Sequence, residues 1–290
     1  MTPEEIVARL WPGRDAEIAV LGGGITNHNF KVTIDGEEEY ALRIAGRDTE
    51  LLGIDRDVEH EASLAAAAVG VGPEVVTCVE GCLVTRFVRG EIVPLERMRE
   101  PETIRRVAAT LRAVHGGPPL PARFNSFRVV ESYRDTALAH GGTVPPAYDR
   151  AAQVARRIET TRGPVPERPC HNDLLNANFI DDGSRIRIVD WEYAGMGDVF
   201  FDLANFASNH ELDAEQAQLL LEAYAGAVRP GDLRALTLMR FMSDFREAMW
   251  GVVQASVSEL DFDFAGYAAE HFERLARTEG SPEFEAALAG

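Results

Sequence analysis

The chain has 290 residues, 46% of them hydrophobic, and a formal net charge of −18. This length suits one large domain or two modest lobes with a real core. Nucleic acids and anionic membranes are bound mainly through Lys and Arg, so the negative charge argues against both as partners and favours a cationic one. Because no apolar run approaches the roughly 20 residues of a membrane span, and no targeting or disulfide pattern is present, we expect a cytoplasmic protein.

The first 90 residues predict a small antiparallel sheet. Alternating apolar residues and tight turns such as Asp35-Gly36 indicate five strands. The expected strands span residues 17–20, 30–34, 40–44, 74–78 and 82–87. A short helix over 3–12 precedes them, and an Ala-rich helix over 57–68 follows the third strand. Gly90 and Pro94 then mark a break in composition.

Beyond that break the sequence predicts a mainly helical region. The spacing of apolar residues favours helices over 102–115, 146–160, 213–226, 230–256 and 261–277. One short hairpin interrupts them, with strands at 179–180 and 186–189. We therefore expect an α+β fold in two parts, residues 1–88 and residues 89–290.

One loop of the helical part carries residues suited to phosphoryl transfer. Asp173 and Asn178 are five positions apart, and Asp190 follows twelve residues later, at the far end of the hairpin. Such a transfer needs a carboxylate beside the acceptor hydroxyl and oxygen ligands that hold Mg²⁺ on the phosphates. Two carboxylates and a carboxamide can supply both, although Asp and Asn also often cap turns.

Three segments together resemble the choline/ethanolamine kinase and aminoglycoside phosphotransferase superfamily. They are His171-Asn172-Asp173 with Asn178, the run Ile188 to Tyr193, and Phe201-Asp202-Leu203-Ala204-Asn205. The resemblance implies a bilobal protein-kinase-like fold, in which a five-stranded antiparallel sheet plus helix binds the nucleotide and a mainly helical lobe binds the substrate. It implies ATP and Mg²⁺ as cofactors, Asp173 as the base or positioning carboxylate, and Asn178 and Asp190 as metal ligands. Asp202 would support the catalytic loop through hydrogen bonds, and His171 would brace it.

The same resemblance assigns the nucleotide site to the N-terminal lobe. The Gly-rich turn with Gly23, Gly24, Thr26 and Asn27 looks like a phosphate loop. Arg43 takes the place of the phosphate-binding cation, which fits a chain whose only lysine is Lys31, and Glu59 would pair with it. Main-chain groups of Arg86, Phe87 and Val88 would face adenine. Taken alone, the Gly-rich segment could be a plain turn, and Arg43 and Glu59 could be a surface pair.

The acceptor site is predicted from the C-terminal segment, which is similar to the choline-site region of choline kinases. Trp250, Phe262 and Tyr267 would surround a quaternary ammonium, and Glu192 would lie at the acceptor together with Asp173. Aromatic faces attract a cation that cannot donate hydrogen bonds. An aromatic stripe at helical spacing, however, is also typical of a packed core.

Two departures from the family pattern leave the acceptor open. Glu247 stands where many members have a Trp, and Asn209 where many have a Glu. Glu247, Glu211 or Asp263 could restore the missing negative charge. The acceptor is thus expected to be choline, ethanolamine or another small cationic alcohol.

Three other functions would leave different marks in the sequence. An aminoglycoside O-phosphotransferase would have a wide acidic cleft in place of an aromatic pocket. A non-catalytic nucleotide-binding regulator would lack a catalytic position, and none is missing here. A protein kinase is disfavoured because Trp191-Glu192 replaces the usual Phe-Gly and no long activation loop follows. The sequence predicts neither the oligomeric state nor the pathway.

Overall fold

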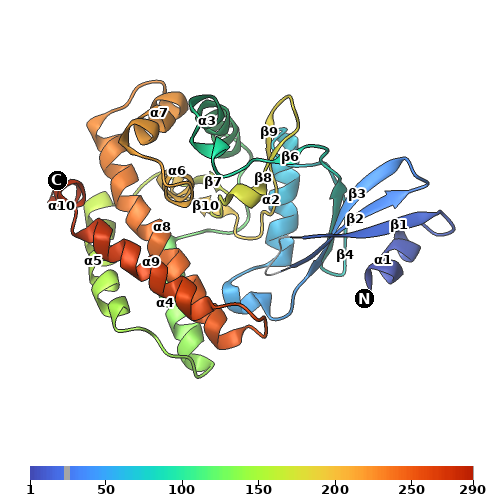
Figure 1. Ribbon diagram of the computed structural model, residues 1–290, viewed down its shortest axis with the longest axis horizontal. Coiled ribbons are helices and arrows are strands. Elements are labelled where there is room, and N and C mark those ends of the chain that lie inside the picture. Colours follow the sequence, from blue (N-terminus) through green and yellow to red (C-terminus); the bar gives the residue numbers. More distant parts are fainter. Residues whose placement is uncertain (23–26, 290) are drawn as a thin grey trace.

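A twisted sheet and a larger group of helices lie side by side in the computed structural model, which describes residues 1–22 and 27–289 (Figure 1). The sheet is antiparallel throughout and has the strand order β1-β2-β3-β5-β4. Its strands are β1 (Ala16–Leu21), β2 (Asn27–Ile34), β3 (Glu38–Ala45), β4 (Val75–Val79) and β5 (Cys82–Arg86). The five predicted strands are therefore confirmed.

The sheet has a small hydrophobic core of its own. Helix α1 (Pro3–Leu10) begins with a capping box, in which the Thr2 hydroxyl accepts from the Glu5 amide and the Glu5 carboxylate accepts from the Thr2 amide. Its buried Ile6 and Val7 pack with side chains of the sheet, including Val32.

Helix α2 (Arg56–Ala68) lies between the sheet and the helices (Figure 1). The Asp55 side chain caps it by accepting from the amides of Asp57 and Val58. The buried Ala62 and Ala66 belong to the larger core, which the helical lobe dominates, and not to the core of the sheet. The division at residue 88 stays a prediction, because α2 shares its packing with the lobe that follows.

Helix α8 (Pro230–Val257) runs through the helical lobe and packs against α4, α6 and α9. The other helices are α3 (Pro101–His115), α4 (Ser126–Ala139), α5 (Ala147–Arg162), α6 (Val199–Asn209), α7 (Ala214–Ala225), α9 (Phe264–Glu279) and α10 (Pro282–Ala289). The five predicted helices are present, while α4, α6 and α10 were not predicted. Within the described residues, none of the helices has both the length and the apolar character that a bilayer crossing requires.

Two small sheets position the loop around Asp173. Strand β7 (Arg168–Cys170) pairs with β10 (Gly195–Gly197) just before the loop. The predicted hairpin is formed by β8 (Phe179–Asp181) and β9 (Ile186–Ile188), and β6 (Glu91–Ile92) adds a third strand to it. Asp173 thus follows β7 and Asp190 follows β9, so both carboxylates leave the ends of short paired strands.

Candidate active site

The buried carboxylate of Asp202, on α6, organises the loop that carries Asp173. It accepts hydrogen bonds from the main-chain amides of His171 at 2.8 Å and Asn172 at 2.7 Å. The His115 ring reaches the same carboxylate at 3.0 Å. Asn172 has a φ of 67°, a left-handed conformation that costs free energy unless its surroundings enforce it. The predicted supporting contacts of Asp202 are present.

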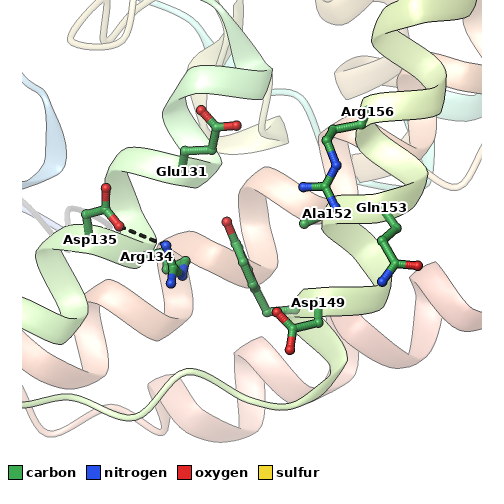
Figure 2. A pocket seen from close by; sticks show the side chains of 8 residues that line it. Glu131, Arg134, Asp135, Asp149, Ala152, Gln153 and Arg156 are labelled. Atoms are coloured by element: carbon green, nitrogen blue, oxygen red, sulfur yellow. Dashed lines mark hydrogen bonds and ion pairs between the residues drawn. The ribbon is translucent and has the colours of Figure 1, made fainter.

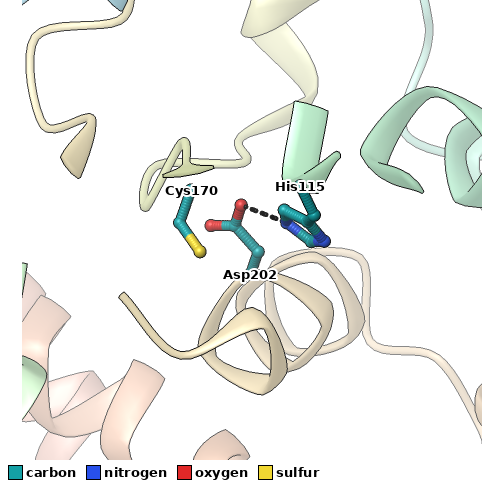
Figure 3. A group of neighbouring side chains, drawn as sticks. All are labelled: His115, Cys170 and Asp202. Atoms are coloured by element: carbon teal, nitrogen blue, oxygen red, sulfur yellow. Dashed lines mark hydrogen bonds and ion pairs between the residues drawn. The ribbon is translucent and has the colours of Figure 1, made fainter. Parts of the chain in front are cut away.

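Cys170 lies beside Asp202 and His115, and this trio has the spacing of a metal cluster (Figure 3). Burial raises the pKa of the Cys170 thiol well above its ordinary value, so the side chain is a neutral, buried thiol in this structure. The Asp202 carboxylate is already engaged by three donors. Asp202 and His115 therefore brace the loop, and Cys170 packs beside them as a buried thiol.

His171 also braces the loop. Its Nε2 lies 3.0 Å from the Val189 carbonyl, and its Nδ1 lies 3.2 Å from the Asp173 amide. Assigning the proton to Nε2 satisfies both contacts with a neutral ring. Burial lowers the pKa of His171, which agrees with that neutral form.

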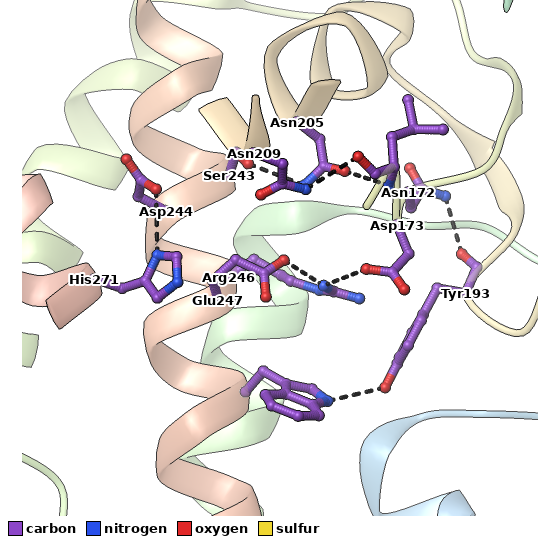
Figure 4. A network of polar contacts seen from close by, with 12 residues as sticks. Asn172, Asp173, Tyr193, Asn205, Asn209, Ser243, Asp244, Arg246, Glu247 and His271 are labelled. Atoms are coloured by element: carbon purple, nitrogen blue, oxygen red, sulfur yellow. Dashed lines mark hydrogen bonds and ion pairs between the residues drawn. The ribbon is translucent and has the colours of Figure 1, made fainter. Parts of the chain in front are cut away.

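Asp173 lies at the centre of the site (Figure 4). The Asn178 carboxamide donates to the Asp173 carbonyl at 2.9 Å, so the loop closes on itself. The Asp173 side chain instead meets a cation from α8, because Arg246 Nη1 lies 3.2 Å from its Oδ1. Burial raises the pKa of Asp173 to about 7, against the opposing effect of Arg246. The sequence did not predict the contact with Arg246.

Arg43 and Glu59 meet as the resemblance implied. The two side chains form an ion pair, and Arg43 Nη1 also donates to Asp190 Oδ1 at 2.6 Å. Asp190 has a φ of 66°, so both carboxylates of the predicted site are next to or within left-handed turns. The side chains of Arg43 and Glu59 are largely buried, at 11% and 2% exposure, so this is not a surface pair.

A second arginine joins this network without having been predicted. Arg56 Nη1 contacts Glu59 at 2.8 Å and Glu192 at 3.0 Å, and its Nη2 donates to Asn27 at 2.9 Å. Glu192 is therefore held between the lobes by Arg56 and Asn27. Its expected place at the acceptor remains a prediction.

The predicted adenine segment begins at Arg86, the last residue of β5. Phe87 and Val88 line a hollow of about 420 Å³ together with Pro73 and Arg187. The amides of Arg86 and Phe87 donate to the carbonyls of Glu74 and Glu39. Within the described residues the Val88 amide makes no such main-chain bond, so it is the one amide of the three left for a ligand. Gly23, Gly24 and Thr26 lie outside the described residues.

The three predicted aromatic residues lie together. Tyr267 is 5.5 Å from Trp250 and 6.2 Å from Phe262, measured between ring centroids. The Trp250 indole donates to the Tyr193 hydroxyl at 3.1 Å. Trp250 is buried, whereas Phe262 is 45% exposed and can form an outer wall. Trp250, Phe262 and Tyr267 therefore form one aromatic cluster, in which Trp250 also belongs to the hydrophobic core of the helical lobe.

Each of the three candidate acidic residues already has a hydrogen-bond or ion-pair partner. Glu247 accepts from Arg246 at 2.6 Å and from the Tyr267 hydroxyl at 2.8 Å. Glu211 pairs with Arg99. Asp263 caps α9 by accepting from the Gly266 amide, which also explains why that helix begins later than residue 261. The Asn209 carboxamide donates to the Leu174 carbonyl, on the Asp173 loop.

A further hollow of about 460 Å³ lies between α4 and α5 (Figure 2). Charged side chains of both signs line it, among them Arg134, Asp135 and Arg156. Arg134 pairs with Asp135 and stacks on Tyr148. None of the predicted site residues lines this hollow.

Comparisons with known proteins agree with this geometry. Residues 17–237 match the family model described as the phosphotransferase enzyme family. Human ethanolamine kinase 2 is 28% identical over 295 residues, which cover 90% of this chain and 76% of that protein. A choline/ethanolamine kinase family protein from Mesorhizobium loti is 30% identical, with a TM-score of 0.85 over 100% of this chain and 98% of that one.

A more distant structure places the fold in a wider group. A thermostable mutant of aminoglycoside phosphotransferase APH(4)-Ia is 18% identical, with a TM-score of 0.68 over 97% of this chain and all of that one. At that identity the likeness concerns the fold alone, and the bilobal kinase-like fold predicted from the sequence is confirmed. The chain belongs to the phosphotransferase enzyme family and, within it, to the choline/ethanolamine kinase family.

Proposed function

We propose that this chain transfers the γ-phosphoryl group of ATP to the hydroxyl of choline or ethanolamine. The observation that carries the proposal is the position of Asp173. Its main chain is held by Asn178, a predicted metal ligand, and its side chain is held by Arg246. Arg246 in turn stacks on Tyr193, which receives a hydrogen bond from Trp250, so one carboxylate connects the catalytic loop with the aromatic cluster.

Asp173 would receive or orient the proton of the acceptor hydroxyl. A pKa near 7 suits that role, because a general base works best when its pKa lies near the working pH. Asp202 and His171 fix the main chain of the loop, so the carboxylate would need little reorganisation when the acceptor binds.

Asn178 and Asp190 fit Mg²⁺ by the chemistry of their donor atoms. Both offer hard oxygen ligands, and Mg²⁺ usually takes only one or two protein oxygens in addition to phosphate and water. The Asn178 amide nitrogen is engaged by the Asp173 carbonyl, so its carboxamide oxygen is the atom left for a metal. When bound, the ion would neutralise phosphate charge.

Arg43 would contact the phosphates, with Glu59 and Arg56 holding it in place. Its bond to Asp190 links the predicted phosphate cation to the predicted metal ligand across the two lobes. Two arginines and three carboxylates are packed here, so nucleotide and metal would replace contacts in an already charged, ordered site.

The acceptor would lie between Asp173 and the aromatic cluster. A quaternary ammonium cannot donate hydrogen bonds, so ring faces rather than a paired carboxylate would recognise it. An intracellular location is part of the proposal, because ATP is the donor and the three cysteines are free thiols.

Release of ADP from Mg²⁺-ATP tests the proposal directly. Choline, ethanolamine, simple sugars and aminoglycosides should be compared as acceptors, with phosphorylated product identified by mass. We expect turnover with choline or ethanolamine, and almost none when Asp173 is replaced by Asn, although that variant still binds nucleotide. Turnover with aminoglycosides alone would show that the chain is an aminoglycoside phosphotransferase and would refute this proposal. Nucleotide binding without turnover on any acceptor would favour a regulator.

A further inference from the structure

Arg246 is one of the most deeply buried side chains of the helical lobe, with 1% of its surface exposed. It projects from α8 toward Asp173 (Figure 4). Its Nη1 bonds both Asp173 Oδ1, at 3.2 Å, and Glu247 Oε1, at 2.6 Å. The guanidinium carbon lies 4.4 Å from the centroid of the Tyr193 ring. A buried cation is thus fixed from three sides next to the proposed base.

The buried Arg246 contributes little to the stability of the fold. Two of the three guanidinium nitrogens, Nε and Nη2, are buried without a hydrogen-bond partner among the described residues. Buried donors that lack partners destabilise a fold, and a buried ion pair often contributes no more than apolar residues of similar size. Arg240 on the same helix offers a contrast, because it donates to the carbonyls of Leu212 and Ala207 and touches no catalytic residue.

Glu247 completes the arrangement. Its second oxygen accepts from the Tyr267 hydroxyl at 2.8 Å. Although burial opposes it, Arg246 together with His271 and Tyr267 holds the pKa of Glu247 below its ordinary value, so the carboxylate stays charged. Glu247 therefore neutralises Arg246 and is engaged at both oxygens.

We infer that Arg246 is a positioning residue, which fixes the carboxylate of Asp173 for reaction and is itself held by Glu247 and Tyr193. The inference rests on the proposed function, because it takes Asp173 as the group that meets the acceptor hydroxyl. Arg246 acts through Asp173 and does not touch the substrate. Since Glu247 cancels its charge, Asp173 supplies the negative charge that faces a cationic acceptor.

The same contacts join the base to the aromatic cluster. Tyr193 carries Arg246 on its ring face and receives the Trp250 indole at its hydroxyl. Tyr267 holds Glu247 and also faces Trp250. The orientation of Asp173 thus depends on side chains that come from the predicted acceptor wall.

The test replaces Arg246 and Glu247 together, so that neither is left as an unpaired buried charge. Arg246→Met combined with Glu247→Gln removes the cation and its counter-charge together. Arg246→Lys keeps a cation of similar reach but loses the planar group. Arg240→Met is the matched control, a largely buried arginine of the same helix with no contact to Asp173. Each variant is measured for kcat, for the KM of ATP and for thermal stability.

We expect the double variant to lower kcat by roughly 100-fold, the order of effect that a misplaced catalytic group produces, with the KM of ATP within about twofold. Arg246→Lys should have a kcat between that of the double variant and that of the native chain. Arg240→Met should lower stability and leave kcat unchanged. In an Asp173→Asn background the double variant should cost nothing further, because Arg246 acts through Asp173. A kcat close to that of the native chain, or a further loss in that background, would overturn the inference.

Crystal structures of the same variants give a readout that requires no turnover. In the double variant the Asp173 carboxylate should leave its present position or occupy several, while the main chain bound by Asp202 stays in place. An unchanged carboxylate refutes the role of Arg246 even if no acceptor is ever phosphorylated. A native chain that turns over none of the acceptors refutes the proposed function alone.

Discussion

Asp202 accepts a hydrogen bond of 2.7 Å from the main-chain amide of Asn172, whose φ of 67° is left-handed. The neighbouring His171 amide donates to the other oxygen of the same carboxylate. The Asn172 side chain adds a bond of 3.0 Å to the Tyr193 carbonyl. An unfavourable backbone conformation just before Asp173 is thus maintained by the buried carboxylate of Asp202 on α6, with the Asn172 side chain as a second support.

Replacing Asp202 by Asn should therefore damage both the fold and the loop. A carboxamide offers one acceptor oxygen where the site presents three donors, so at least one buried amide loses its partner. We expect the free energy of unfolding, measured in urea, to fall by about 3 kcal/mol, and kcat to fall with it. Asp149→Asn, at an exposed position on α5, serves as the control and should change neither quantity. An Asp202→Asn variant as stable as the native chain would contradict this account.

The candidate catalytic loop could be predicted because its residues lie close together in the sequence. Asp173, Asn178 and Asp190 lie within 18 positions of one another, and their spacing follows from one loop and one hairpin. The strands were also predictable, because the Asp35-Gly36 turn separates β2 from β3 and the Glu80-Gly81 turn separates β4 from β5. Helix α4 was not predicted, although Asn125 caps it and its buried Val130, Tyr133 and Ala137 lie on one helical face.

Arg246 could not be predicted in the same way. It lies 73 positions beyond Asp173, in a long helix whose other buried residues are mostly apolar. The one available signal was an Arg-Glu pair inside that apolar run, since charged residues are almost never fully buried unless paired. Arg56 was missed for the same reason, because its contact with Glu192 spans 136 positions.

Glu59→Gln should weaken the proposed nucleotide site. Arg43 would lose one of its two carboxylate partners, and Arg56 would lose its bond to the same side chain. We expect kcat/KM for ATP to fall by about tenfold, which corresponds to about 1.4 kcal/mol of lost stabilisation, while the KM of the acceptor changes little. Steady-state kinetics with ATP as the varied substrate would measure this.

The control for this prediction is Glu80→Gln. Glu80 pairs with Arg9 on the surface of the same lobe, where both side chains are more than half exposed. Surface pairs contribute little, so this variant should behave as the native chain does. If both variants lower kcat/KM equally, the effect comes from general loss of charge and Glu59 has no special part.

Trp250→Leu should separate the two candidate acceptors. The change removes a large ring face and the indole bond to Tyr193. Cation–π contacts are worth about 0.5–2 kcal/mol, so the KM of choline should rise roughly 2- to 30-fold. Ethanolamine carries an ammonium that donates hydrogen bonds, so its KM should rise less. An equal rise in both KM values would show that Trp250 packs the core and does not recognise the cation.

Trp11→Leu is the control for Trp250→Leu, because it also removes a tryptophan that packs on an aromatic ring. Trp11 packs on Tyr40 in the sheet lobe at 4.6 Å between centroids. It should lower stability without changing the ratio of the two acceptor KM values. A change in that ratio would indicate that the effect of Trp250→Leu is not specific to the acceptor wall.

His210 should make the fold sensitive to mild acid. It is fully buried at the end of α6, with Nδ1 at 2.7 Å from the Phe206 carbonyl and the Phe206 ring at 4.4 Å. Burial lowers the pKa of His210 to about 4, whereas an unfolded chain has a His pKa of about 6.5. As the pH falls below about 6.5, the unfolded chain takes up a proton that the folded chain refuses, so stability is lost until about pH 4 and no further below it.

His210→Gln should remove this part of the pH dependence. The difference in unfolding free energy between native and variant chains should shrink by up to about 3 kcal/mol between pH 6.5 and pH 4. Taking that difference cancels the carboxylates that titrate in the same range. His140→Gln, at an exposed site, should leave the profile unchanged. A constant difference between the native and His210→Gln chains across this range would mean that His210 accepts its proton in the folded state, and that the aromatic packing around it tolerates the charge.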